Sequence, residues 1–238
     1  MSTTYHFSSE VLIRSCPLST SLISHKSRTQ HSLTISATKI EPMSLFLKRH
    51  KKHLEYNVME VFIECIGRQL QYLERENKGV SSFNIDDITV FHSDETPDET
   101  PDEPSDEPSE TTIQFAMTND DKIHDIDEDH QLIIDIPYPK QYTTAETTTT
   151  TKNKGFHSPE FKEFISKKSI PYKIHFKSGY YSFGLLCIYC YVSRTTTTTT
   201  PTPTDITNLL EPIINTKIYW FLKQVLQENP TNRRYICV

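Results

Sequence analysis

The stretch IPYKIHFKSGYYSFGLLCIYCYVSR, from Ile170 to Arg194, is the most apolar and aromatic part of the chain. From Pro171 to Lys177, aromatic and β-branched residues alternate with basic ones, which is typical of a half-buried strand. Gly179 then supplies a turn residue. The segment from Tyr180 to Val192 is almost continuously apolar, as in a strand buried on both faces. We therefore expect the two segments to form an antiparallel hairpin, with Gly184 marking a bulge or a close approach.

Two other interpretations of this stretch are weighed against its length and spacing. A membrane-spanning helix needs about 20 apolar residues, and the run from Phe183 to Val192 is roughly half as long, so we expect no span there. Cys187 and Cys190 form a Cys-x-x-C pair, but residues three apart on a strand point to opposite faces. A zinc site commonly uses a second such pair, and a redox pair begins at a helix N-terminus. The sequence indicates neither, so we expect buried structural cysteines and leave a redox or metal role open.

The low-complexity tracts divide the chain into sections. Its 238 residues could hold one or two domains. Residues 94–110 contain nine acids and no lysine or arginine, and residues 143–154 and 195–204 are rich in threonine. Such tracts are expected to be disordered, because they carry too little apolar surface to form a core. We therefore predict a single α+β domain over residues 41–238, interrupted by these three insertions.

Residues 1–40 form a Ser/Thr-rich arm with a single acidic residue, Glu10. That composition is similar to an organelle transit peptide. Pro17 and the absence of an early arginine-rich amphipathic face favour a polar arm instead, with short strands at Glu10–Arg14 and Ser32–Thr38. Whether this arm is cleaved is left open.

The rest of the chain alternates helices and strands. A helix is expected within Met43–Asn77, with a wide apolar stripe and Gly79 as its stop signal. A short helix should begin with Ser158 as N-cap and Pro159 in the first position. The last helix should run from Pro212 to about Leu226, ending before Asn229-Pro230, after an entry turn capped by Asp205. Its apolar row consists of Ile214, Ile218, Phe221 and Val225. Strands are expected at residues 83–91, 112–117 and 131–136, with an edge strand at 233–238.

One stretch resembles a known family. Residues 221–233, FLKQVLQENPTNR, are similar to the helix and Asn-Pro-x-x-Arg stretch late in protein kinase domains. The glycine-rich loop, the His-Arg-Asp loop and the Asp-Phe-Gly motif of that family do not occur, so the sequence does not identify a kinase.

Other candidate sequence motifs are incomplete or absent. The Asp-x-Asp-x-Asp run at 125–129 would need glycine at its sixth position and glutamate at its twelfth to form a calcium loop, and these positions hold His130 and Ile136. Phosphate-binding, nucleophile-elbow and zinc-protease motifs are absent from the sequence. We predict no catalytic, cofactor-binding or metal-binding residue, and no cofactor.

The charge is unevenly distributed. The formal net charge is −6, and the acidic tract at 94–110 alone accounts for −9, which leaves +3 for the rest. Basic residues cluster at 48–53 and at 152–177. The second region contains seven lysines and only two glutamates. Such patches suit nucleic acid or anionic membrane, although a solvated surface explains them as well. We hypothesise that the acidic tract screens the basic region.

The sequence as a whole predicts an α+β fold, with a mainly antiparallel sheet of about five to seven strands and two long amphipathic helices packed on it. We expect a non-catalytic adaptor or subunit of an intracellular protein complex, acting through contacts with an unidentified protein partner. The alternatives are an enzyme with dispersed catalytic residues, or a nucleic-acid or anionic-lipid binder that uses residues 48–53 and 152–177. Irregularly spaced cysteines and the lack of an apolar leader favour the cytoplasm or nucleus, with organelle import through the acid-poor N-terminus open.

Overall fold

The structure is a computed structural model that describes residues 3–18, 25–28, 32–50, 53–94, 111–134, 155–167, 173–192 and 203–235. The insertions predicted at 94–110, 143–154 and 195–204 lie almost wholly outside these ranges. The α+β class is confirmed, because helices and antiparallel strand pairs make up the described part. Within the described ranges, no helix has the length and apolarity needed to cross a bilayer.

The strands form four small antiparallel sheets in the described part, rather than the one larger sheet that the sequence suggested. The first sheet has the order β1 (Thr3–Phe7), β3 (Leu33–Ala37), β2 (His25–Arg28), and the second β4 (Lys39–Pro42), β7 (Ile88–Asp94), β8 (Thr111–Met117). The third has the order β10 (Leu132–Ile133), β9 (Ile123–Ile126), β5 (Lys78–Val80). The last pairs β11 (Gly155–Phe156) with β6 (Phe83–Asn84).

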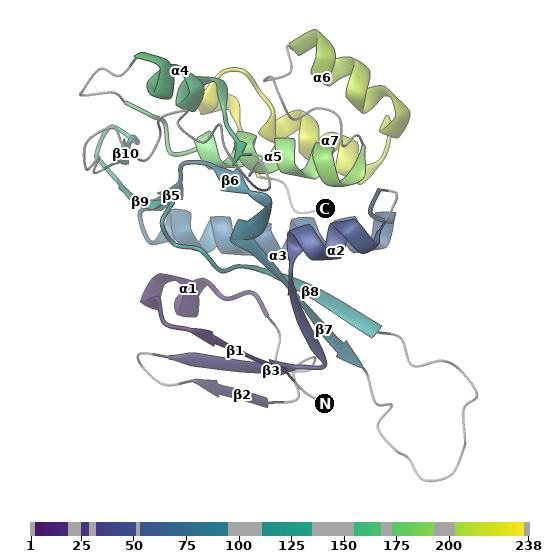
Figure 1. Cartoon of the computed structure of the whole chain (residues 1–238). Coiled ribbons are helices and arrows are strands. Elements are labelled where there is room, and N and C mark those ends of the chain that lie inside the picture. Colours follow the sequence, from purple (N-terminus) through teal and green to yellow (C-terminus); the bar gives the residue numbers. More distant parts are fainter. Residues whose placement is uncertain are drawn as a thin grey trace, which may run out of the picture.

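The helices are arranged around a long central one, α3. They are α1 (Glu10–Ser15), α2 (Met43–Arg49), α3 (Tyr56–Arg75), α4 (Pro159–Lys167), α5 (Ser178–Tyr191), α6 (Pro203–Leu210) and α7 (Lys217–Val225). In Figure 1, α5, α6 and α7 gather on one side of α3, while the β1–β3 sheet and the β7–β8 hairpin lie on the other. A large apolar core contains side chains from β1, α3, α5 and α7 and joins the N-terminal sheet to these helices, while Leu132, Phe161, Phe164 and Ile174 form a second, smaller cluster.

The hairpin predicted between Ile170 and Arg194 is wrong. Ser178–Tyr191 is the helix α5, buried on nearly every side. A run that is apolar at every position has no period that separates a strand from a helix, and a helix that is apolar all round belongs in a core. Of the strand expected at 171–177, the described residues 173–177 contain a single bridge, between His175 and Gln131. Gly184 marks a close approach, since a Cβ there would lie 2.8 Å from the Val225 side chain in α7.

The helix predicted within Met43–Asn77 is two helices, α2 and α3. The expected stop at Gly79 is wrong, because α3 ends at Arg75 and Asn77 takes the positive φ of 54°. Gly79 lies in β5 instead.

The last helix begins later than predicted. Pro212 belongs to a 3-10 turn, Glu211–Ile213, and α7 begins at Lys217, where the Thr216 hydroxyl accepts a hydrogen bond from the Tyr219 N–H at 3.1 Å. Ile214 is therefore 55% exposed and is not part of the apolar row, whereas Ile218, Phe221 and Val225 are buried. The helix ends at Val225, before the Asn229-Pro230 signal.

Shorter elements were predicted with mixed success. The strand at 112–117 is confirmed as β8, and the strand at 32–38 as β3. Residues 10–14 form part of the helix α1 rather than a strand. The strand at 83–91 is split by a 3-10 turn, Ile85–Asp87. Of the strand predicted at 131–136, residues 132–133 form β10, and residues 135–136 lie outside the described residues. An edge strand was predicted at 233–238. Residues 233–235 do not form a β-strand, and residues 236–238 lie outside the described residues.

Candidate functional site

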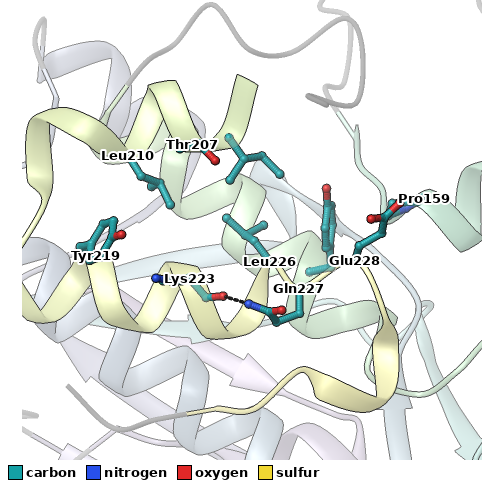
Figure 2. Close-up of a pocket in the computed structure, with 10 residues that line it drawn as sticks. Pro159, Thr207, Leu210, Tyr219, Lys223, Leu226, Gln227 and Glu228 are labelled. Atoms are coloured by element: carbon teal, nitrogen blue, oxygen red, sulfur yellow. Dashed lines mark hydrogen bonds between the residues drawn. The ribbon is translucent and has the colours of Figure 1, made fainter. Parts of the chain in front are cut away.

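A pocket of about 430 Å³ lies among the helices of the C-terminal half. Its walls come from the start of α4, from α5, from α6 and from α7 with the loop that follows it. Figure 2 shows Leu210 of α6 facing Leu226 across the pocket, with Tyr219 and Lys223 toward one end and Glu228 and Pro159 toward the other. The lining residues are Pro159, Tyr181, Ile206, Thr207, Leu210, Tyr219, Lys223, Leu226, Gln227 and Glu228.

The lining has the chemistry of a small-molecule site. Ile206, Leu210 and Leu226 are buried and supply an apolar wall. Polar residues occupy other positions of the lining, among them Lys223 and Glu228. Ligand pockets of roughly 300–1,000 Å³ with apolar walls and a small number of polar groups are the usual form of such sites.

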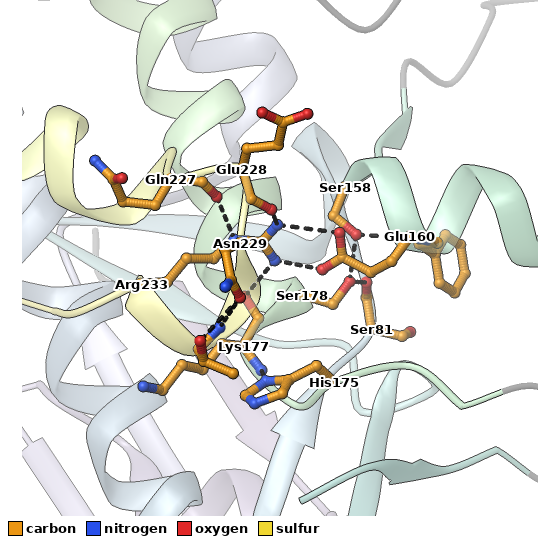
Figure 3. Close-up of polar contacts among 12 residues, drawn as sticks. Ser81, Ser158, Glu160, His175, Lys177, Ser178, Gln227, Glu228, Asn229 and Arg233 are labelled. Atoms are coloured by element: carbon orange, nitrogen blue, oxygen red, sulfur yellow. Dashed lines mark hydrogen bonds and ion pairs between the residues drawn. The ribbon is translucent and has the colours of Figure 1, made fainter. Parts of the chain in front are cut away.

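A buried ion pair holds the wall of this pocket in place. Arg233 is fully buried and forms a two-point ion pair with Glu160, in which Nη2 lies 3.0 Å from Oε2. The same guanidinium donates to the backbone carbonyl oxygens of Gln227 at 2.8 Å and Glu228 at 3.1 Å, as Figure 3 shows. The loop after α7 is therefore fastened to the first turn of α4, which fixes two sides of the pocket relative to each other.

The floor of the pocket contains Tyr181, over whose ring the Arg233 guanidinium lies at 4.8 Å. This distance suits a cation–π contact, which gains strength away from water. Burial raises the pKa of Tyr181 to about 12, so its hydroxyl stays protonated at neutral pH and can donate a hydrogen bond to a ligand.

The helix α4 begins as the sequence predicted, and its cap lies beside this ion pair. The Ser158 hydroxyl accepts a hydrogen bond from the Phe161 N–H at 3.2 Å, which confirms Ser158 as the N-cap. It also lies 2.6 Å from the Ser178 hydroxyl, which in turn donates to the Ser81 carbonyl at 3.0 Å. This buried chain of hydroxyls joins α4, the start of α5 and the segment after β5, as Figure 3 shows.

Cys187 and Cys190 lie in α5 and are fully buried. Burial raises the pKa of Cys187, so its thiol is protonated and has little reactivity. Within the described ranges, no group of three or more His, Cys, Asp or Glu side chains could hold a metal ion. A metal or redox role for this pair therefore has no geometric support in the part of the chain that the structure describes.

The basic regions are partly neutralised by ion pairs. In the region 48–53, Arg49 pairs with the buried carboxylate of Glu41. In the region 152–177, Lys173 pairs with Asp129. Residues 51–52, 152–154 and 168–172 lie outside the described residues.

A second polar cluster surrounds Asp87, and its members form hydrogen bonds with one another. The Asp87 carboxylate accepts hydrogen bonds from the Asn84 N–H at 2.6 Å, from Asn119 Nδ2 at 3.1 Å and from Lys122 Nζ at 2.6 Å. These contacts hold the 3-10 turn before β7. The Asp125–Asp129 run that resembles a calcium loop is spread over β9 and the turn after it, where Asp127 accepts from the Gln131 N–H at 2.7 Å.

The sequence did not predict the pocket or the Arg233–Glu160 pair. Glu160 was placed in the first turn of α4 and Arg233 in an edge strand, and 73 positions separate them. The Asn-Pro-x-x-Arg stretch that ends at Arg233 was the one available signal, since it marks an arginine at a fixed place after a buried helix.

No protein-family model and no curated protein matches the chain. Among solved structures, the chain is similar to the kinase domain of PknI from Mycobacterium tuberculosis, with a TM-score of 0.46 and 10% identity. The match covers 90% of this chain and 66% of that one.

The solved structure found in this comparison is a kinase domain and not an adaptor, so the comparison does not support the adaptor interpretation drawn from the sequence. We therefore do not retain a non-catalytic adaptor as the function. With so low a TM-score and identity, we take no activity, substrate or residue role from that protein.

Proposed function

We propose that the chain binds a compact, partly apolar small molecule in the pocket between α4, α5, α6 and α7. The observation that carries this proposal is the pocket itself, whose volume of about 430 Å³ lies in the range of small-molecule sites. Its rigid wall adds support. The buried Arg233–Glu160 pair fixes the wall before a ligand arrives, so binding orders few side chains.

An enzyme with dispersed catalytic residues is the interpretation from the sequence that such a pocket fits best. In this view the pocket holds the substrate. No pair of groups within the pocket has the arrangement of a nucleophile and its base, so we assign no catalytic step.

The test is a small-molecule screen with a blocked pocket as control. Thr207 is exposed and lines the pocket, so Thr207→Phe should close it without disturbing the core. The neighbouring Asn208 is also exposed and does not line the pocket, so Asn208→Phe is the matched control. Ligand-observed NMR should find compounds that bind the wild type and the Asn208→Phe variant but not Thr207→Phe.

Two outcomes of this screen are informative. Ligands that bind all three proteins equally would place binding elsewhere and refute the proposal. Ligands that pass the blocked-pocket control can then be followed over time, and chemical conversion would establish an enzyme.

The remaining expectations stay predictions. Binding of nucleic acid or anionic membrane through residues 48–53 and 152–177 is supported only by composition, and two of the described basic residues there, Arg49 and Lys173, are already paired. A protein partner is unidentified. We keep the cytoplasm or nucleus as the proposed location, because the five cysteines are irregularly spaced and do not form the framework of a disulfide-rich protein.

A further inference from the structure

The pocket contains two opposite charges that lack ionic partners in the described part of the chain. Lys223 and Glu228 both line it, and within the described residues neither side chain forms an ion pair with the other or with a third group. Figure 2 shows Lys223 toward the Tyr219 end and Glu228 toward the Pro159 end.

The surroundings of each charge differ. The Lys223 ammonium lies over two aromatic rings, at 5.7 Å from the Tyr219 centroid and 5.2 Å from the Trp220 centroid. Such contacts stabilise a cation but leave its hydrogen-bond donors free for an anion. The Glu228 side chain lies near Tyr181, and its charge contributes to the raised pKa of that phenol. A carboxylate accepts hydrogen bonds only, so it suits an ammonium group.

Between the two charges, leucine side chains form part of the wall, beside the polar Thr207 and Gln227. Leu210 and Leu226 are buried and face each other there. A ligand that fills this space must therefore have an apolar body, and a ligand that satisfies both ends must carry an anion at one end and a cation at the other.

We propose that the pocket recognises a zwitterionic small molecule with an apolar body, of which an apolar dipeptide with free termini is the simplest member. Its carboxylate would bind Lys223 and its ammonium group Glu228. This inference rests on the proposed function and adds the chemical class of the ligand.

The chain provides its own reporter for the test. Trp220 is the single tryptophan of the sequence and contacts Lys223, so a carboxylate that binds Lys223 should change its fluorescence. The probes are leucyl-phenylalanine, its N-acetyl form, its C-terminal amide and the form blocked at both ends. Affinities are measured for the wild type, Lys223→Gln, Glu228→Gln and a control, Lys217→Gln. Lys217 lies on the same helix, is exposed and does not line the pocket.

Each charge should contribute about tenfold to affinity, which corresponds to about 1.4 kcal/mol for one charge-assisted hydrogen bond. In the wild type and in Lys217→Gln, amidation and acetylation should each weaken binding by that factor. In Lys223→Gln the amide should bind as well as the free acid, and in Glu228→Gln the acetylated form should bind as well as the free amine.

The result that overturns this inference differs from the one that overturns the proposed function. Equal affinity of all four probes for the wild type, or no binding of any of them, would show that the two charges do not select the ligand. The pocket would still be a small-molecule site if other compounds lose binding in Thr207→Phe alone. An equal loss of affinity in Lys223→Gln and Lys217→Gln would also overturn the inference. It would show a general effect of positive charge rather than binding at Lys223.

Discussion

Replacement of Glu160 by glutamine leaves the buried guanidinium of Arg233 without its counter-charge. Arg233 is fully buried, and the Glu160 side chain is 16% exposed. In the variant, the remaining oxygen partners of the guanidinium are the neutral amide and the backbone carbonyls of Lys177, Gln227 and Glu228. A buried cation that is surrounded only by neutral dipoles is poorly stabilised. These dipoles do not fully replace the favourable interaction with water that the cation loses on burial.

Removal of one partner of a buried ion pair costs about 3–5 kcal/mol. For a chain of this size, that loss lowers the melting temperature by roughly 6–20 °C. Arg233 also fastens the loop after α7 and lies over the Tyr181 ring, so it has little room to move toward water. The loss in the free energy of unfolding should therefore lie at the upper end of this range.

The assay is urea unfolding followed by circular dichroism, with a matched exposed pair as control. Arg68 and Glu64 form an i,i+4 pair on the surface of α3, with side chains 63% and 52% exposed. Glu64→Gln should therefore cost less than about 1 kcal/mol. A Glu160→Gln variant that is no less stable than Glu64→Gln would refute the reasoning that this ion pair is buried and essential.

A double-mutant cycle separates the pair from its surroundings. In an Arg233→Met background there is no buried charge to neutralise, so adding Glu160→Gln should cost much less than it does in the wild type. The two changes should couple by about 0.5–3 kcal/mol, the range for residues in direct contact. Simple addition of the two costs would mean that each side chain stabilises the fold independently.

Three further predictions follow from other parts of the chain. Gly184→Val should destabilise the fold by about 1–3 kcal/mol in the same unfolding assay, because its side chain would collide with α7. Replacement of residues 95–110 by a short Gly/Ser turn should leave cooperative unfolding intact, because Asp94 and Thr111 pair directly across β7 and β8 and closure costs little. Burial lowers the pKa of His157 to about 4, below its unfolded value of 6.5. The unfolded state therefore binds more protons between these values, stability should fall as the pH drops from 6.5 to 4, and His157→Leu should weaken that dependence.

Local signals in the sequence were sufficient for several elements. The Ser158-Pro159-Glu160 start of α4 was predictable because a hydroxyl N-cap and a proline at the first position act within one turn. The strand β8 and the buried face of α7 were predictable for a similar reason, since their apolar residues keep a clear period against polar neighbours.

The helix α5 could not be predicted by the same method. Periodicity reports the contrast between a buried and an exposed face, and α5 has almost no exposed face. Length was the better guide, since the apolar run from Tyr180 to Val192 is longer than most strands. The alternation at 171–177 and the turn signal at Gly179 suggested a hairpin, which the helix α5 contradicts.

The pocket depends on a break in the chain that the apolar pattern concealed. Ile214 continues the spacing of Ile218 and Phe221, so the last helix was expected to start at Pro212. In the structure the chain turns at Glu211–Ile213, Asn215 takes a positive φ of 71°, and Thr216 caps α7. This turn lets α6 and α7 form two walls of one pocket, and a single helix through the same residues could not place both there. The apolar spacing therefore gave the buried face of α7 correctly, while the capping hydroxyl and the left-handed asparagine, which carry no apolar signal, determine whether the pocket exists.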